Sequence, residues 1–182
     1  LVGSEMCIRD SLNIKGTGTL TNPTVSSGIA WYTYRHMIRL VNIEAGITNL
    51  PDFAFFGCTA LEVVNFAADS RLTTIGGSVF NGCTSLKELT LPGRVKTIYG
   101  NAFRGCANLT AVYLPDTVSY ITNSAFSGCG KVVLSVAYNS YAKQYAINNG
   151  IAYSERGRAV TASGSCGANA TWALYSDGTL SI

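Results

Sequence analysis

Apolar side chains recur at nearly fixed spacing four times between residues 47 and 136, and each copy carries the motif A/V-F-x-G-C-x-x-L/V. In the copy at residues 95–115, the motif is followed by alternating apolar and polar positions that end at Pro115. The cysteines of the motif follow one another at steps of 25, 23 and 23 residues: Cys58, Cys83, Cys106 and Cys129. Self-similarity at a period of about 20 to 29 residues is typical of supersecondary units stacked into a solenoid.

The end of each copy predicts a β-strand, because a period-two alternation over a few residues is the pattern of a half-buried strand. Stacked copies would place these strands side by side in one parallel sheet, about 4.8 Å apart. The return leg of each coil is expected to hold a short apolar pair and one helical or 3-10 turn. The strands are predicted at residues 38–43, 61–66, 86–91, 109–114 and 132–136.

The phenylalanine of each motif is predicted to lie inside the coil and to stack on the phenylalanine of the next coil. The glycine before each cysteine is expected to adopt a backbone conformation that is barred to residues with a Cβ. The core set predicted in this way comprises Phe55, Phe80, Phe103 and Phe126 together with Cys58, Cys83, Cys106 and Cys129.

Both ends of the repeat array are predicted to be atypical, as terminal repeats usually are. Residues 31–43 resemble a degenerate first coil, with Tyr32 in the place that Phe55 takes one period later. Residues 140–149 predict a capping helix, with Asn139 or Ser140 as N-cap and Gly150 after its C-terminus.

The solenoid is therefore expected to span residues 31–153, with a linker at 154–163 and a β-hairpin at 164–182. Residues 179–182, TLSI, match residues 11–14, SLNI, 168 positions earlier. This match predicts a larger module of about that length, and with it a piece of a longer tandem protein. Residues 12–30 would then be a strand and loop from a preceding β module, and 164–182 the start of the next. Residues 1–11 are expected to be a non-native leader, because GSEMCIRDS resembles translated sequencing-adapter read-through.

Composition narrows the possible partners. Apolar residues make up 47% and charged residues 13% of the 182 residues, which argues against a disordered chain. The net charge of +3 is too weak to indicate nucleic-acid binding. No apolar run approaches 18 residues, so no membrane span is predicted.

The four repeated cysteines do not predict a zinc site. Equivalent positions on successive coils lie about 4.8 Å apart, so four of them span roughly 14 Å, whereas the sulfurs of a tetrahedral site must lie within about 4 Å of one another. Disulfides between neighbouring coils remain open, because the Cα spacing suits them. The preferred interpretation is a row of buried free thiols that pack as small apolar groups.

No catalytic or cofactor-binding residue is predicted. His36 is the only histidine, and nothing in the sequence ties it to a nucleophile. The aspartates at positions 52, 69, 116 and 177 fall in predicted turns, where local hydrogen bonding explains them. The chain is therefore expected not to be an enzyme and to need no metal or cofactor.

The outward face of the predicted sheet is the strongest functional candidate, because solenoids bind partners on such extended faces. Tyrosine is favoured as an anchor at protein interfaces. The alternative is that an exposed sheet face must hold some residues, and Asn, Thr and Tyr are ordinary there. The candidate interaction residues are Asn42, Asn65, Glu88, Thr90 and Tyr113.

The repeated motif, with L-x-L-P downstream, resembles the BspA-type leucine-rich repeat of bacterial surface proteins. This resemblance covers residues 31–153, and residues 171–182 resemble the short β module that precedes such repeats. It implies an α/β-type, mostly β, right-handed leucine-rich repeat coil with parallel strands, short helical turns, a capping helix and a small C-terminal hairpin. It also implies an extracellular or cell-surface location, with adhesion to a host, matrix or other surface protein, and no shared catalytic residues.

Three functions follow as hypotheses. The first is a non-catalytic protein-interaction or adhesion module. The second is a structural spacer in a tandem surface protein, which the 168-residue repeat favours. The third is a carbohydrate-binding accessory module of a secreted hydrolase, which the aromatic content of 10% leaves open, with a glycan as the partner.

Overall fold

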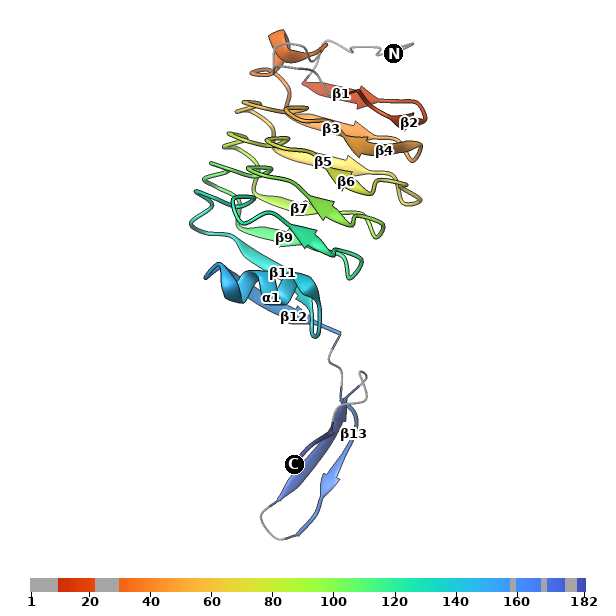
Figure 1. Cartoon of the computed structure of the whole chain (residues 1–182), viewed down its shortest axis with the longest axis vertical. Helices are drawn as coiled ribbons and strands as arrows, with labels where there is room; N and C mark the ends of the chain where they lie inside the picture. The colour runs from red at the N-terminus through yellow and green to blue at the C-terminus, as the bar shows by residue number, and fades with distance from the viewer. Residues whose placement is uncertain (1–9, 22–29, 158–159, 168–169, 176–179) are drawn as a thin grey trace.

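The computed structural model describes residues 10–21, 30–157, 160–167, 170–175 and 180–182. Most of the predicted leader, the loop at 22–29 and the predicted hairpin turn at 176–178 lie outside the described residues. Figure 1 shows a stack of similar coils, each carrying strands on two sides, with a helix near its lower end and a separate small sheet beyond it. The mostly β, parallel-strand solenoid predicted from the repeat is confirmed.

The first column of strands carries the predicted half-buried rungs. These strands are parallel and in register, so that Val41 lies opposite Val64 and Leu89 opposite Val112. The column also includes residues 11–14, which pair in register with residues 40–43 and so belong to the solenoid stack. The strands are β1 (Ser11–Ile14), β3 (Leu40–Ile43), β5 (Val63–Phe66), β7 (Glu88–Thr90), β9 (Ala111–Tyr113), β11 (Val133–Ala137) and β12 (Ala152–Arg156).

The prediction of one continuous sheet in this column is wrong. Hydrogen bonding joins β1, β3 and β5 into one sheet and β7, β9, β11 and β12 into another, and β5 does not pair with β7. The coil between them is two residues longer than its neighbours, and the extra residues lie in the turn at 67–71, where the later coils have Pro92 or Pro115. The loss of pairing therefore coincides with the longer turn.

A second column of short strands runs along the return legs of the coils. Its five strands are parallel and form a continuous sheet in which Leu50, Ile75, Ile98 and Ile121 lie on successive rungs. The sequence predicts only apolar pairs here, because two-residue strands leave little periodicity to detect. The strands are β2 (Gly18–Thr19), β4 (Ile47–Leu50), β6 (Thr74–Ile75), β8 (Thr97–Ile98) and β10 (Tyr120–Ile121).

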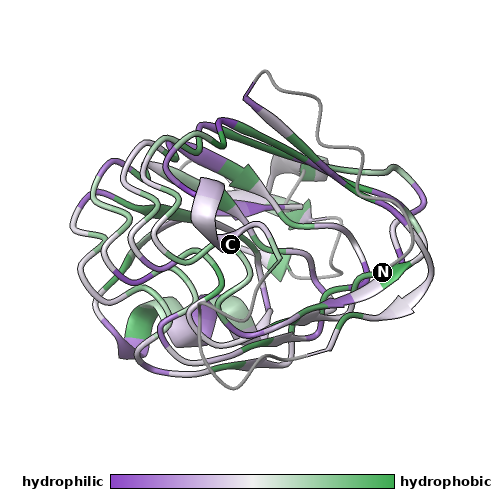
Figure 2. Cartoon of the chain, turned by 90° about the horizontal axis from the view of Figure 1, so that it is seen from above, coloured by the Kyte–Doolittle hydropathy of each residue, from purple (hydrophilic) through white to green (hydrophobic). Residues whose placement is uncertain are grey.

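The core between the two columns is an aromatic stack. The rings of Phe55, Phe80 and Phe103 are fully buried, and successive centroids lie 5.4 Å apart. Phe126 continues the stack at 4.8 Å from Phe103, and Tyr145 closes it at 6.2 Å. Figure 2, which looks along the stack, shows the successive coils superposed around this shared interior.

The first coil differs from the prediction in one residue. Trp31, not Tyr32, takes the place of the phenylalanine, with its ring 6.0 Å from that of Phe55. The indole Nε1 of Trp31 donates a 2.6 Å hydrogen bond to the carbonyl of Ala54, so this buried donor is satisfied. Tyr32 begins the short 3-10 helix η2 (Tyr32–Tyr34) and is only partly buried.

The predicted helical turn before each cysteine is a hydrogen-bonded turn. In the second coil the N–H of Cys58 donates to the carbonyl of Phe55, and Gly57, directly before Cys58, has a φ of +68°. The equivalent glycines of the other three coils also have positive φ, as the sequence predicts.

The C-terminal end of the solenoid is closed by α1 (Tyr141–Asn148), with the side chain of Ser140 accepting a hydrogen bond from the N–H of Lys143 as N-cap. The next segment was predicted as a linker at 154–163, but β12 pairs with β11 as far as Arg156. A three-stranded antiparallel sheet follows: β13 (Val160–Ser165), β14 (Thr171–Tyr175) and β15 (Leu180–Ser181). Only β14 and β15 of this sheet were predicted.

Candidate functional site

The candidate site is the outer face of the first strand column, here called the strand face. Along each strand the backbone alternates, so the residues between the buried ones point to solvent. Val41 and Val112 are fully buried, whereas Val63, for example, is 46% exposed. The predicted interaction residues all lie on this face, half-buried or exposed: Asn42, Asn65, Glu88, Thr90 and Tyr113.

Three asparagines on the strand face form a ladder of side-chain hydrogen bonds. Asn42 Nδ2 donates to Asn13 Oδ1 at 2.8 Å, and Asn65 Nδ2 donates to Asn42 Oδ1 at 2.9 Å. Asn42 and Asn65 are among the predicted interaction residues and Asn13 is not, although the three strands share an N-I or N-F ending that marks it. The ladder leaves the Oδ1 of Asn65 facing the break between β5 and β7.

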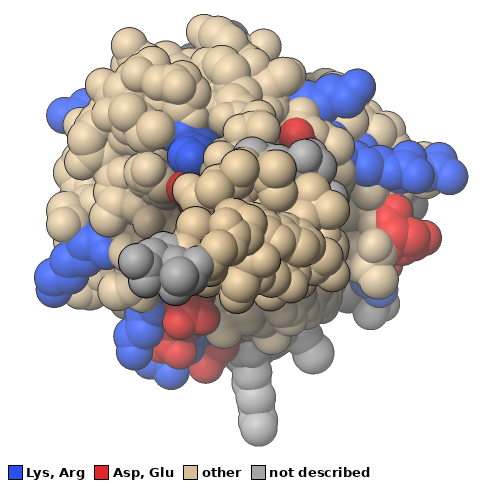
Figure 3. All heavy atoms as spheres, turned by 90° about the horizontal axis from the view of Figure 1, so that it is seen from below, with Lys and Arg blue, Asp and Glu red and all other residues tan. Residues whose placement is uncertain are grey.

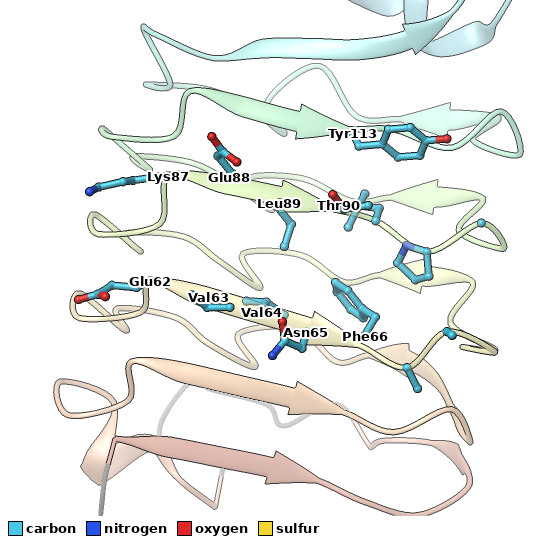
Figure 4. A pocket seen from close by; sticks show the side chains of 15 residues that line it. Glu62, Val63, Val64, Asn65, Phe66, Lys87, Glu88, Leu89, Thr90 and Tyr113 are labelled. Carbon is cyan, nitrogen blue, oxygen red and sulfur yellow. The ribbon is translucent and has the colours of Figure 1, made fainter. Parts of the chain in front are cut away.

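A groove of about 840 Å³ lies at the break, lined by residues of β5, β7 and the turns that follow them. Figure 4 shows β5 and β7 on its two sides, with Glu88 and Tyr113 directed outward and Phe66 lying beside the gap. Val64 and Leu89 are buried at its base, whereas Val63 and Thr90 are exposed beside it. The groove therefore combines an apolar base with polar walls.

The groove also exposes backbone hydrogen-bonding groups. In β5 the N–H groups of Val63 and Ala67 donate to β3, to the carbonyls of Arg39 and Ile43. Because alternate residues of a parallel strand bond to opposite sides, Val64 and Phe66 direct their backbone groups toward β7, with which β5 does not pair. The facing edges of β5 and β7 therefore lack strand pairing, and an unpaired strand edge can accept a further strand.

Tyr113, the predicted anchor, is held by a residue that the sequence analysis missed. The guanidinium of Arg156 lies over its ring, 3.7 Å from the centroid, which is a cation–π arrangement. Arg156 Nη2 also donates to the carbonyl of Leu114 and lies 3.3 Å from Asp116 Oδ1. Arg156 thus covers part of the ring of Tyr113, which remains 36% exposed.

The core cysteines are free thiols that bond to the preceding coil. Cys83 Sγ donates to the carbonyl of Phe55 at 3.2 Å, and Cys106 and Cys129 make the same contact one and two coils later. Burial raises the pKa of the Cys58 thiol to about 12 and that of Cys83 well above its usual range. Cys58 and Cys83 therefore stay protonated at neutral pH, and a protonated thiol is a poor nucleophile and a poor metal ligand.

The remaining sequence candidates lie apart from the strand face. His36 is exposed, in the turn after η2. Within the described ranges, no group of three or more His, Cys, Asp or Glu side chains is placed to hold a metal ion. Among the same residues, no helix has the length and apolar character needed to cross a membrane.

On the face drawn in Figure 3, the charged side chains do not gather in one patch. Figure 3 shows Lys and Arg at several separate places on the face seen from below, with Asp and Glu beside some of them. Two of the ion pairs are Arg39 with Glu62 at 3.8 Å and Lys143 with Glu155 at 2.9 Å. Isolated charges of this kind do not form an extended basic surface for nucleic acid.

Comparison with protein families finds a match to the BspA type Leucine rich repeat region, with six copies over residues 19–149. No curated protein matches the chain.

Several solved structures of leucine-rich repeat proteins are similar to this chain. A leucine rich cell surface protein from Faecalibacterium prausnitzii is 27% identical (TM-score 0.61), and the match covers 77% of this chain and 35% of that one. A leucine-rich repeat protein from Bacteroides ovatus is 26% identical (TM-score 0.56; 66% and 30% covered). The leucine rich repeat protein of T. pallidum, at 19% identity (TM-score 0.59; 70% and 58% covered), shares the fold. The chain thus spans between about a third and three fifths of the length of these proteins.

Proposed function

This chain belongs to the BspA-type leucine-rich repeat family, and we propose that it is a non-catalytic module that binds a protein partner on its strand face. The observation that carries the proposal is the groove at the break between β5 and β7. It is the place on the strand face where exposed apolar side chains, polar side chains and unpaired backbone groups lie together.

The composition of the groove favours a protein over a glycan. Val63, which is 46% exposed, and the partly buried ring of Phe66 both line the groove. Burying such apolar surface is favourable at roughly 25 cal/mol per Å². The free N–H and C=O groups of the strand edges suit a polypeptide backbone, which carries the same groups.

We also propose that the module acts at the cell surface, as an adhesin. The support is the family and the name of the similar Faecalibacterium prausnitzii protein, which is described as a cell surface protein.

The test is binding of the purified chain to a panel of purified secreted and extracellular matrix proteins, measured by biolayer interferometry. Val63→Glu places a charge in the groove, and we expect it to weaken binding at least tenfold. Tyr120→Glu is the matched control, because Tyr120 is 49% exposed on β10, in the other strand column, and should leave binding unchanged.

Circular dichroism spectra and melting temperatures of both variants would show that they are folded. Binding that survives Val63→Glu but is lost in Tyr120→Glu would move the site to the second column. If the chain binds no protein of the panel but binds on a glycan array, the partner is a carbohydrate and the proposal of a protein partner is wrong.

A further inference from the structure

The C-terminal sheet has an apolar face that the rest of the described chain leaves largely uncovered. Its register places Leu174 opposite Leu180 and Trp172 opposite Gly164. The indole of Trp172 lies across this face, because a Cβ added to Gly164 would meet its Nε1 at 2.9 Å. Leu174, Leu180 and Ile182 are 37%, 56% and 84% exposed. Apolar side chains exposed together on one face are typical of a binding surface.

The same strand pattern is buried at the other end of the molecule. Residues 11–14 read SLNI and residues 179–182 read TLSI, of which residue 179 lies outside the described part. In β1, Leu12 and Ile14 are each 3% exposed and belong to the solenoid core. Their counterparts Leu180 and Ile182 are the exposed residues of the C-terminal sheet. The two strands therefore show one pattern with and without a coil stacked against it.

In β1, the edge that pairs with the next coil is set by its alternating backbone groups. The carbonyl of Asp10 accepts a hydrogen bond from the N–H of Leu40, and the carbonyl of Ile14 accepts one from the N–H of Glu44. By the alternation of a parallel pair, residues 10, 12 and 14 direct their backbone groups toward β3.

In β15, the equivalent edge is free. The N–H of Cys166 donates to the carbonyl of Ala170, which makes these two residues a hydrogen-bonded pair. Alternation along the antiparallel strands then directs the backbone of Ala173 toward β15 and that of its partner Ser181 toward β14. The backbone groups of Leu180 and Ile182 point to the other edge, which is the edge that Leu12 and Ile14 use to pair with β3.

We propose that the C-terminal sheet caps the first coil of a leucine-rich repeat solenoid of this kind, with β15 in the place that β1 occupies here. The occupant is a coil like residues 31–50, joined in the same chain after β15. A strand like β3 would pair in parallel with the free edge of β15, and residues like Val41 and Ile43 would cover Leu180 and Ile182. β14 would remain paired on the opposite edge. This inference concerns how modules join and does not depend on the partner of the strand face.

The test is a tandem protein in which the whole chain is followed directly by residues 15–182 of a second copy. The second solenoid then lacks its own β1 and must use β15 of the first copy. In a background with Cys7→Ser and Cys166→Ser, Ile182→Cys in the first copy reports on the junction through its reaction rate with a thiol reagent. We expect reaction at the rate of an exposed thiol in the single chain and at least 100-fold slower in the tandem. Ile14→Cys in the single chain is the matched buried control.

A second measurement tests the energetic role of the same side chains. Leu180→Asp should leave the urea midpoint of the single chain nearly unchanged but lower the midpoint of the second solenoid in the tandem. Leu12→Asp, which changes the equivalent residue of β1, should lower the midpoint of the single chain. Equal labelling rates in the single chain and the tandem would overturn the proposal. A second comparison could also overturn the proposal. It would do so if the second solenoid stays unfolded in this tandem but folds in a tandem that keeps residues 10–14 of the second copy behind a Gly-Ser linker.

Discussion

The aromatic stack gives the sharpest test of how this solenoid is stabilised. Phe103 is fully buried between the rings of Phe80 and Phe126, at centroid distances of 5.4 and 4.8 Å. Replacing it by alanine removes the transfer free energy of the ring and leaves a cavity, which together cost about 3–5 kcal/mol. A typical domain has a free energy of unfolding of about 5–15 kcal/mol, so the variant should lose a large part of its stability.

The assay is urea unfolding followed by far-UV circular dichroism, with the slope of the transition compared between variants. An unchanged slope shows that the difference in midpoint reports stability. Phe103→Leu, which retains most of the volume, should cost less than Phe103→Ala. A loss below about 1 kcal/mol for the alanine variant would refute the reasoning, because a buried ring without a cavity penalty is inconsistent with close packing.

A double-mutant cycle separates ring stacking from burial. Phe80→Leu and Phe103→Leu remove two stacked rings, and their coupling should be about 0.5–1.5 kcal/mol. Phe55→Leu with Phe103→Leu is the control pair, because Phe80 lies between these rings, and we expect additivity within about 0.5 kcal/mol. Equal coupling in both pairs would show that the stack has no neighbour-specific stabilisation.

Three further results are expected. Arg156→Lys should lower stability by about 1–2 kcal/mol in thermal unfolding, because lysine cannot bond Leu114 and Asp116 while covering Tyr113; an unchanged melting temperature would contradict this. In the native state the four core thiols should resist a thiol reagent while Cys166 reacts, and all should react in denaturant. Stability should fall as the pH rises from about 9 toward 12. Burial raises the pKa of Cys58 from 9.0 to about 12 and that of Tyr145 from 10.0 to about 12, so the unfolded state loses these protons first; Cys58→Ala should make the fall shallower.

Most of the architecture can be predicted from local sequence, because the same core residues and glycines recur in four successive coils. The period, the buried phenylalanines and the glycines with positive φ all depend on residues within one coil. The placement of Trp31 in the aromatic stack cannot be predicted in this way. In the degenerate first coil, either Trp31 or Tyr32 can be aligned with the phenylalanine of the later coils. The structure resolves the alignment through the indole hydrogen bond to Ala54.

The candidate site was predictable only in part. Alternation along the strands identifies the outward residues, among them Asn65 and Tyr113. The contact of Arg156 with Tyr113 joins residues 43 positions apart and follows from the pairing of β12 with β11, which the sequence analysis assigned to a linker. The break beside β5 had a visible signal, the 25-residue step between Cys58 and Cys83, but its effect on strand pairing depends on how the longer turn packs.

The loss of pairing between β5 and β7 also has a mechanical consequence. The return-leg column stays hydrogen-bonded across this level through β4 and β6, and the rings of Phe55 and Phe80 remain in contact there. The coils on either side are also joined along the motif turns, where the N–H groups of Phe55 and Gly57 donate to the carbonyls of Val79 and Asn81, so only the strand side lacks pairing. We expect bending to concentrate at this level, so that the angle between the coils on either side widens or narrows the opening on the strand side.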